Sequence, residues 1–372
     1  MAVRLKRSGV GHVLLPGIKL ITLRLIVSLI KILFKAILVL FGVVTLVFWM
    51  FQGLGDPERM LMGQTTDSLT RSRIRTELHL DMPAWKQYLF YLNDLSPIAV
   101  HSKKEIEENG LTGIFIGEEK KLSFKLPYLR VSYQSKKEVG SIFAEALPGT
   151  MILAFSAIFF ATIIGVFLGT LAAVKKDSWL DFGAVFSSIL GISAPSFFVA
   201  LLFAWVFGFL LSDYTGLQMT GSWFEYNPET GKKVLTLHHL ILPALTLGIR
   251  PLAFITQLTR IAMLDVLHQD LIRTARAKGL AFKMIILRHA LRNATNPVLT
   301  AVSGWLAELL AGSFFVESIF GWKGIGKVTV DALDKLDYPI VMGGVLISAC
   351  FFVLVSGITD FLYKRLDPRI KE

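Results

Sequence analysis

Long apolar segments alternate with polar ones along the whole chain, and this alternation is the first structural signal in the sequence. A run without charge covers 36–52, and five more apolar segments lie at about 147–174, 183–211, 239–263, 296–316 and 339–362. Each is close to or above the ~20 residues that a helix needs to cross a bilayer. The pattern predicts an all-α integral membrane protein with six transmembrane helices.

The polar segments between these spans divide the chain into regions. We expect 1–35 to be a basic amphipathic N-terminal segment, whose lysines reach headgroups from a helix in the membrane interface. A cleaved signal peptide is disfavoured, because the apolar run starts late and no small-x-small site follows it. The other predicted regions are the first transmembrane helix at 36–53, an extracytoplasmic loop or small cap at 54–146, a five-helix core at 147–363 with a cytoplasmic loop at 264–295, and a cytoplasmic tail at 364–372.

Composition and charge support a membrane protein and give its orientation. The chain is 53% hydrophobic and has a net charge of +11. Four regions, 1–35, 175–182, 260–295 and 364–372, together carry 20 basic and 6 acidic residues, whereas 53–146, 212–238 and 317–338 carry 18 and 20. The positive-inside rule therefore predicts that both termini are cytoplasmic. Charge distributed in this way is a topology signal, and it does not form the clustered basic surface of a nucleic-acid-binding protein.

The most basic stretch, from Asp270 to Pro297, predicts two short helices. Asp270 suits the start of the first helix, Lys278 its last turn, and Gly279 a left-handed cap that ends it. A second helix is predicted for Phe282–Ala294, with Pro297 in the first turn of the next segment. Two helices joined by a glycine between two spans make a rigid knob for another protein to grip. The alternative is a loop whose positive charge only fixes membrane orientation.

This stretch resembles the cytoplasmic loop of ABC importer permeases, and in particular the first (B-type) permease of the dipeptide/oligopeptide/nickel family. The resemblance rests on RTARAKGL, on RHALRN, and on a proline four residues beyond that asparagine. The wider superfamily has a Glu-Ala-Ala triplet here, followed after three residues by glycine. In this chain Arg273, Thr274 and Ala275 hold the triplet positions and Gly279 holds the glycine, which is normal for the peptide branch. The resemblance extends over about 36–57 and 128–372.

The resemblance implies a fold, a function and a set of partners. It implies a type I ABC importer permease in the bacterial cytoplasmic (inner) membrane that forms the translocation path for di- or oligopeptides. The partners would be a second similar permease, two cytoplasmic ATPase subunits and an extracytoplasmic solute-binding protein that chooses the solute. The chain itself would be no enzyme and would hold no nucleotide, cofactor or metal. The residues implied to dock on an ATPase are Asp270, Arg273, Thr274, Ala275, Arg276, Ala277, Lys278 and Gly279.

Apart from Arg260, which is counted with the cytoplasmic loop, three charged residues lie inside the predicted spans, where a charge is costly unless it faces protein or water. Arg250 precedes Pro251 in the fourth span, Glu308 interrupts the fifth, and Asp360 lies near the end of the sixth. We expect Arg250 and Glu308 to line the translocation path, with a neighbouring subunit as the alternative partner of Glu308. Asp360 matches the closing pattern of the family and has a predicted structural role.

One motif tempts an enzymatic interpretation. Gly321–Lys327 has the spacing of a phosphate-binding P-loop up to the lysine, but Val328 stands where Ser or Thr would hold magnesium. In the family a similar run is Glu-x-x-Phe-x-x-x-Gly-x-Gly, matched here from Glu317 to Gly326. We therefore predict a tight re-entrant turn outside the membrane and no role for Lys327 in nucleotide hydrolysis.

Other features have structural interpretations. The adjacent pair His238-His239 lacks a third metal ligand nearby in the sequence, so interfacial polar contacts are expected. Gly165 and Gly169 form a small-xxx-small pair suited to helix packing. Pro195 and Pro251 are expected to kink the third and fourth spans.

Two other classes of protein remain as alternatives. A secondary transporter would need no ATPase, but it should show internal repeats and charged coupling residues near the midplane. No repeat is visible, and Glu308 alone is suggestive. A membrane enzyme would need a polar catalytic cluster, which the sequence does not show. Residues 97–125 are extra material relative to the family, and the resemblance assigns them no role.

Overall fold

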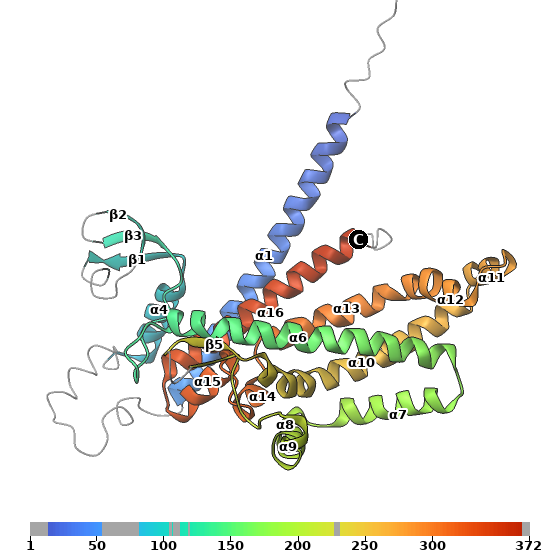
Figure 1. Ribbon diagram of the computed structural model, residues 1–372. Coiled ribbons are helices and arrows are strands. Elements are labelled where there is room, and N and C mark those ends of the chain that lie inside the picture. The colour runs from blue at the N-terminus through green and yellow to red at the C-terminus, as the bar shows by residue number, and fades with distance from the viewer. Residues whose placement is uncertain are drawn as a thin grey trace, which may run out of the picture.

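The structure is a bundle of long helices with smaller polar elements at both ends (Figure 1). It is a computed structural model, and it describes residues 14–53, 82–103, 106, 112–117, 120–226 and 231–366. The long helices are α1 (Leu14–Gly53), α6 (Val139–Val174), α10 (Ile241–Leu267), α13 (Leu291–Leu310) and α16 (Tyr338–Leu366). α10 packs against α6 and α13, α13 packs on α16, and α16 packs on α1.

The number of spans differs from the prediction. Within the described part of the chain, four helices are long and apolar enough to cross a membrane, and a bent helix pair raises the number to five. α13 occupies the place of the fifth predicted span, but polar residues such as Asn293, Asn296 and Glu308 lower its hydropathy. The all-helical membrane class is confirmed, and the count of six is not.

α1 is one continuous helix that joins the basic N-terminal segment to the first span. The sequence predicted a separate interfacial helix within 1–35, but the helix that begins at Leu14 runs without interruption to Gly53. Residues 1–13 lie outside the described part of the chain. Many large apolar side chains between Ile30 and Met50 are exposed, so this surface is available to lipid or to a second subunit.

α6 and α10 approach each other through glycines. A Cβ atom added to Gly169 would lie 2.7 Å from the Cβ of Thr259, and one on Gly165 would lie 2.9 Å from Cγ2 of Ile255. On α10, a Cβ on Gly248 would lie 3.0 Å from the carbonyl oxygen of Ala157. Only glycine permits these distances, so the predicted packing role of the small-xxx-small pair is confirmed.

The third predicted span is broken, not merely kinked. α7 (Trp179–Ser193) is followed by α8 (Ser196–Trp205) and the π-helical η2 (Val206–Leu210), and the two halves are bent by 104°. Ala194 is extended, with ψ 127°, because the ring of Pro195 disfavours the helical conformation in the residue before it. Pro251, by contrast, lies inside the continuous helix α10.

Residues 98–125 of the outer loop form a small antiparallel sheet beside α4 (Ala84–Leu95). Its strand order is β1–β3–β2, for β1 (Ile98–Ser102), β2 (Gly113–Ile116) and β3 (Lys120–Lys125). The Asn93 side chain fixes the sheet to α4, because its amide donates to the carbonyl oxygen of Val100 at 2.9 Å and accepts from the amide of the same residue at 3.1 Å. Residues 54–81 of the predicted outer loop lie outside the described part of the chain.

A buried aspartate attaches the segment before α6 to the start of α16. The Asp337 carboxylate accepts hydrogen bonds from the Ser132 hydroxyl (2.5 Å) and from the backbone N–H groups of Tyr133 (3.1 Å) and Gln134 (3.2 Å). Between α13 and α16 the chain forms α14 (Phe314–Ile319) and α15 (Ile325–Asp334), which lie at the end of the bundle opposite α11 (Figure 1). We call these two ends the α15 end and the α11 end.

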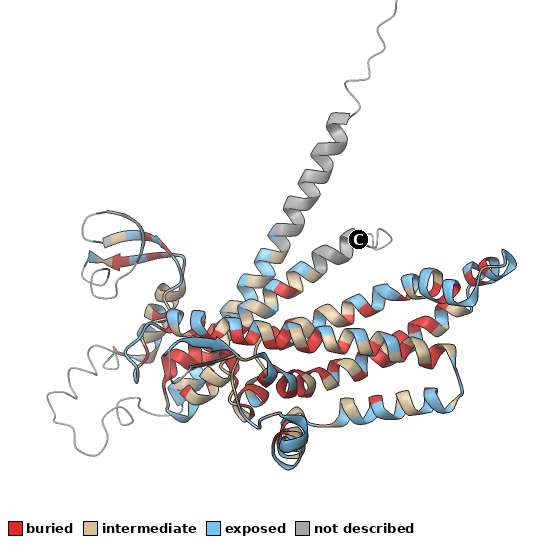
Figure 2. Cartoon of the chain, viewed as in Figure 1, coloured by how far each residue is buried: buried red, intermediate tan, exposed pale blue. Residues whose placement is uncertain are grey.

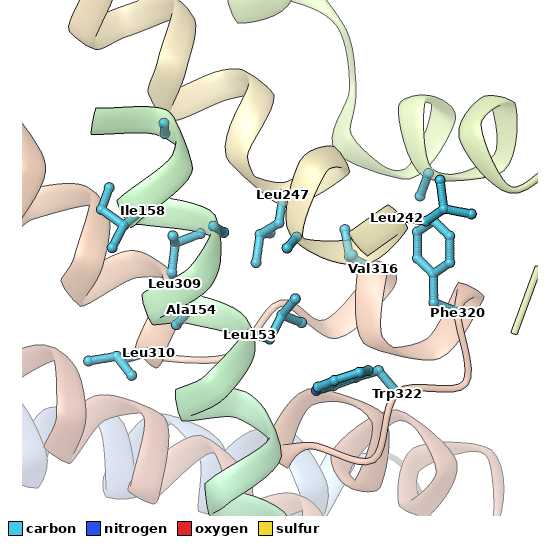
Figure 3. Packing of buried hydrophobic residues seen from close by; sticks show 14 of the residues in the cluster. Leu153, Ala154, Ile158, Leu242, Leu247, Leu309, Leu310, Val316, Phe320 and Trp322 are labelled. Carbon is cyan, nitrogen blue, oxygen red and sulfur yellow. The ribbon is translucent and has the colours of Figure 1, made fainter. Parts of the chain in front are cut away.

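The remaining elements complete the two ends and the core. At the α15 end lie α9 (Ser212–Thr215), the hairpin β4 (Phe224–Tyr226) and β5 (Lys233–Leu235), and η3 (Leu237–Leu240). At the α11 end lie α11 (Asp270–Ala277), α12 (Phe282–Met284) and the π-helical η4 (Ile285–Ala290). Burial concentrates where α6, α10 and α14 meet (Figure 2). Trp322 and Phe320 are fully buried there, Trp322 beside Leu153 of α6 and Phe320 beside Leu242 of α10 (Figure 3).

Candidate functional site

The knob predicted at 270–297 is present as two helical segments separated by a glycine. α11 ends at Ala277, and Gly279 follows with φ +72° and donates its N–H to the carbonyl oxygen of Arg276 at 2.9 Å. The predicted left-handed cap is therefore confirmed. A Cβ atom at Gly279 would meet nothing within 4 Å, so the constraint at this position is conformational and not steric.

One of the eight predicted docking residues faces inward. Ile272 and Ala275 are both buried, three residues apart, and pack into an apolar cluster with Met263 of α10 and Ile285 of η4. Ala275 is thus a core residue, and its small size serves packing within the chain. The i, i+3 spacing of Ile272 and Ala275 was the signal in the sequence that could have shown this.

The other seven predicted docking residues are exposed and form a basic outer surface. They are Asp270, Arg273, Thr274, Arg276, Ala277, Lys278 and Gly279. Arg273 and Asp270 form an ion pair at 3.5 Å, and both side chains are about nine-tenths exposed, so this pair adds little stability. Among the described residues Arg276 and Lys278 have no ion-pair partner, and their charges are directed to solvent.

The segment from Phe282 to Leu310 differs from the prediction in one respect. The second helix was expected to end near Ala294, with Pro297 in the first turn of a new segment. α12, η4 and α13 instead follow one another directly, and Pro297 lies inside α13. The residues before Pro297 contain no second breaker that would end the helix. The π-helical turn of η4 supplies a local irregularity of the kind often found at functional sites.

A partly buried ion pair, which was not predicted from the sequence, supports the α11 end. Arg260 of α10 donates twice to the carboxylate of Asp181 in α7, once from Nη2 at 2.7 Å and once from Nε. The backbone N–H of Asp177 donates to the same carboxylate at 3.0 Å. Two donors from one guanidinium fix both the distance and the orientation of α7 relative to α10.

The two charges predicted for the translocation path are both exposed. Arg250 of α10 places its guanidinium 5.7 Å from the ring centroid of Trp305 in α13. Glu308 lies on α13 one turn beyond Trp305. The side chain of Asp360, the third charge, lies outside the described part of the chain.

The P-loop-like segment is occupied by a carboxylate of the chain itself. Glu317 of α14 is fully buried, and it accepts hydrogen bonds from the backbone N–H of Lys327 (3.0 Å) and from the hydroxyls of Thr150 (3.1 Å) and Ser313 (3.3 Å). Burial raises the pKa of Glu317 above its usual range, and these hydrogen bonds offset part of the rise. The backbone groups at the start of α15 are therefore directed at Glu317.

The glycines in this segment make the predicted tight turn. Gly321 has φ +65°, and a Cβ atom on Gly324 would lie 2.6 Å from the hydroxyl oxygen of Thr150. The Lys327 ammonium pairs with Asp331 one turn along α15, at 2.7 Å. Its side chain is thus engaged within α15, away from the Glu317 carboxylate.

The histidine pair is part of the polar surroundings of η3. His239 is buried, and its ring nitrogens lie 3.1 Å from Oε1 of Gln218 and 3.3 Å from the carbonyl oxygen of Ser222. In the described part of the chain no three His, Cys, Asp or Glu side chains form a group that could hold a metal ion.

Comparison with known proteins identifies the family. Residues 165–372 match the family described as binding-protein-dependent transport system inner membrane component, and residues 24–154 match the N-terminal region of such membrane components. A structure of the MetNI methionine ABC transporter in an inward-facing conformation aligns with a TM-score of 0.48 and 16% identity, over 61% of this chain and 97% of that chain.

Several curated relatives cover most of the chain. The di/tripeptide transport system permease protein DppB of Pseudomonas aeruginosa is 34% identical over 89% of this chain and 94% of its own length. The dipeptide transport system permease protein DppB of Alkalihalophilus pseudofirmus is 32% identical over 94% and 98%. The protein of the same name from Haemophilus influenzae is 40% identical over 64% and 76%. The chain therefore belongs to the family of inner-membrane components of binding-protein-dependent transport systems.

Proposed function

We propose that this chain is the permease subunit of an ATP-driven importer of di- or oligopeptides, coupled through α11 to a separate ATPase subunit. The observation that carries the proposal is the exposed basic surface of α11, whose direction is fixed by the left-handed residue Gly279. Family membership and the peptide-permease names of the relatives support the substrate class. The ATPase of such a system is a separate subunit, so the chain is not itself catalytic.

The α11 end is the cytoplasmic end in this proposal. The loops predicted at that side carry 20 basic and 6 acidic residues, against 18 and 20 at the other side. Both termini are then cytoplasmic, and the α15 end with its small sheet faces outward. A solute-binding protein delivers its cargo to the α15 end, while two ATPase subunits serve this permease and a second, similar one.

Movement of the ATPases reaches the membrane through α11. A groove on an ATPase subunit holds the exposed face of α11, while Ile272 and Ala275 anchor the opposite face to α10 and η4. The Arg260–Asp181 ion pair passes the movement from α10 to α7. The spans then rock between inward-open and outward-open arrangements, and Arg250 and Glu308 line the path between the two permeases.

Substitution at Gly279 tests this proposal. In Gly279→Val the positive φ incurs about 1–2 kcal/mol of strain in a β-branched residue, which changes the direction of α11 without touching a span. We expect the protein to accumulate in the membrane while peptide uptake falls at least about tenfold, since 1.4 kcal/mol corresponds to a factor of ten.

The matched control is Gly216→Val. Gly216 also has a positive φ, +66°, also caps a short helix and also has open space around it, but it lies at the α15 end. We expect near-normal uptake in this variant. If Gly279→Val transported peptide as fast as Gly216→Val, with normal stimulation of ATP hydrolysis by the loaded binding protein, α11 would not be the coupling element.

A further inference from the structure

Two opposite charges on the surface of the predicted membrane-spanning helices have no ionic partner in the described part of the chain. These are Arg250 of α10 and Glu308 of α13, and both are exposed. Other buried or bundle-facing charges are satisfied internally: Asp181 by Arg260, and Glu317 by Thr150, Ser313 and the Lys327 amide. Arg250 and Glu308 are therefore left for a group from outside the chain.

Trp305 connects the two charges. The Arg250 guanidinium lies 5.7 Å from the centroid of the Trp305 ring, and the Phe254 ring approaches the same indole with centroids 6.1 Å apart. Glu308 follows Trp305 by three residues on α13, so the two side chains share one side of the helix. The carboxylate therefore lies one helical turn from the residue that contacts the guanidinium, so both charges belong to the same part of the surface formed by α10 and α13.

The outward surface of α13 differs from one that faces lipid. Along α6 the exposed positions at four-residue spacing are Phe155, Phe159, Ile163 and Phe167. Along α13 the positions at the same spacing are Asn296, Thr300, Gly304 and Glu308, and each is at least partly exposed. A polar row that leads to a carboxylate fits a water-filled path, whereas the aromatic row of α6 fits acyl chains.

We propose that Arg250, Trp305 and Glu308 form a binding station for the two charged ends of a peptide during its passage through the membrane. The proposal rests on the function given above and names its substrate class more closely: a short zwitterionic peptide. Arg250 takes the terminal carboxylate, because a guanidinium presents paired donors to it. Glu308 takes the terminal ammonium. Trp305 positions the guanidinium through its ring face.

The station is tested by reversing charges in the complete importer, purified with its second permease and ATPases and reconstituted with its loaded binding protein. Arg250→Glu and Glu308→Arg each leave two like charges, so we expect uptake of dialanine to fall at least about tenfold. The double variant keeps both charges in exchanged positions. A free zwitterion binds it in the opposite direction, and we expect uptake at least about fivefold above either single variant.

Two further measurements separate the alternatives. Asp213→Arg, at an exposed position of α9, is the control for charge reversal and should transport normally. The amount of second permease that co-purifies should be unchanged in every variant. If the single variants lose the second permease, the charges pair across the subunit interface and the station is rejected. It is also rejected if the double variant is no better than the singles.

A photoreactive dipeptide, alanyl-p-benzoylphenylalanine, tests the location directly. Delivered by the binding protein and trapped in the importer with vanadate, it should crosslink to α10 or α13 around Phe254 and Trp305. Crosslinks confined to other helices would overturn the proposal. A different result would overturn the proposed function itself: no peptide-loaded binding protein stimulates ATP hydrolysis by the unmodified importer.

Discussion

The two ends of the bundle solve the problem of charge in different ways. At the α15 end, two carboxylates are buried and hydrogen-bonded: Glu317 receives donors from Thr150, Ser313 and the Lys327 amide, and Asp337 receives three from the segment before α6. At the α11 end, Arg276 and Lys278 are exposed and have no ion-pair partner among the described residues. The two buried carboxylates thus find their partners within the chain, whereas these two exposed cations do not find one in its described part.

The contrast between internally paired and exposed charges indicates which surface binds a partner. A charge satisfied inside the chain contributes to stability, because leaving its donors unpaired in a buried site is costly. A charge left at the surface contributes little to stability, and its removal is felt only when a partner binds. We therefore expect substitutions of the two buried carboxylates at the α15 end to destabilise the protein, and substitutions of the exposed basic residues at the α11 end to uncouple transport from ATP hydrolysis.

The largest expected effect concerns the orientation of the protein in the membrane, because the contrast between the α15 end and the α11 end assumes that they face opposite sides. In a Cys350→Ser background, a cysteine at Asp334 should react with an impermeant thiol reagent on intact spheroplasts, and a cysteine at Lys278 should not. Both positions are exposed in the structure, so accessibility does not bias the result. Labelling of the Lys278 cysteine in sealed cells would place the α11 end outside.

Glu317→Leu should cause the next largest effect. The leucine has a similar volume but leaves two hydroxyls and the Lys327 N–H without their acceptor, and we expect a loss of about 3 kcal/mol or more in the free energy of unfolding. Thermal unfolding in detergent measures it. Glu145→Leu is the control, since Glu145 is 65% exposed in a loose pair with Lys323 and should change stability by less than about 0.5 kcal/mol. Equal effects of the two variants would contradict the buried role of Glu317.

Asp337→Asn should be milder. The asparagine carbonyl oxygen can still accept from the Ser132 hydroxyl and the Gln134 N–H, which share one carboxylate oxygen, but its NH2 group then faces the Tyr133 N–H, and we expect a loss of about 1–2 kcal/mol. Limited proteolysis should then cut between Arg130 and Lys137 faster than in the parent. Asp334→Asn, at an exposed position on α15, is the control. Unchanged proteolysis in Asp337→Asn would show that this attachment does not hold the segment.

The smallest effect on stability is expected at the α11 end, where substitutions should change coupling and leave the fold unchanged. Arg276→Gln combined with Lys278→Gln should change the free energy of unfolding by less than about 0.5 kcal/mol. ATP hydrolysis stimulated by the loaded binding protein should nevertheless fall several-fold. Lys175→Gln with Lys176→Gln removes the same charge from a neighbouring exposed loop and should leave the stimulation intact. A similar loss in both double variants would mean that net charge, not docking by α11, is responsible.

The sequence predicted the features that depend on local pattern. Hydropathy placed the long helices, and the residues around Gly279 identified the cap, because a helix that ends in glycine after basic residues has few alternatives. The features that the sequence did not predict depend on three-dimensional packing. A small residue such as Ala275 suits close contact with a partner as well as packing in the core of its own chain, so the sequence does not distinguish the two roles. Pro195 is compatible with a kink or a break, and the 104° bend depends on how α8 packs.

The role of Glu317 could not be predicted from the sequence for a related reason. Glycines that bring backbone N–H groups together create an anion site, but their spacing does not say whether the anion is a phosphate or a side chain of the same protein. Only the fold shows that Glu317 fills this site. The sheet at 98–125 had a weak signal, since Ile98, Val100, Leu122 and Phe124 alternate with other residues, but the strands are short.

The glycine contact between α6 and α10 makes these two helices one rigid unit, here called the rod. With backbones this close, neither helix can slide past the other without a clash, so they move together. The rod has α11 at one end and, through Thr150 of α6, the Glu317 cluster at the other. A displacement of the rod at either end therefore moves the other end as well. In the proposed importer, thermodynamic reciprocity then requires that a solute-binding protein which binds at the α15 end and shifts these helices changes the affinity of the ATPase for α11 by the same factor as the ATPase changes the affinity for the binding protein.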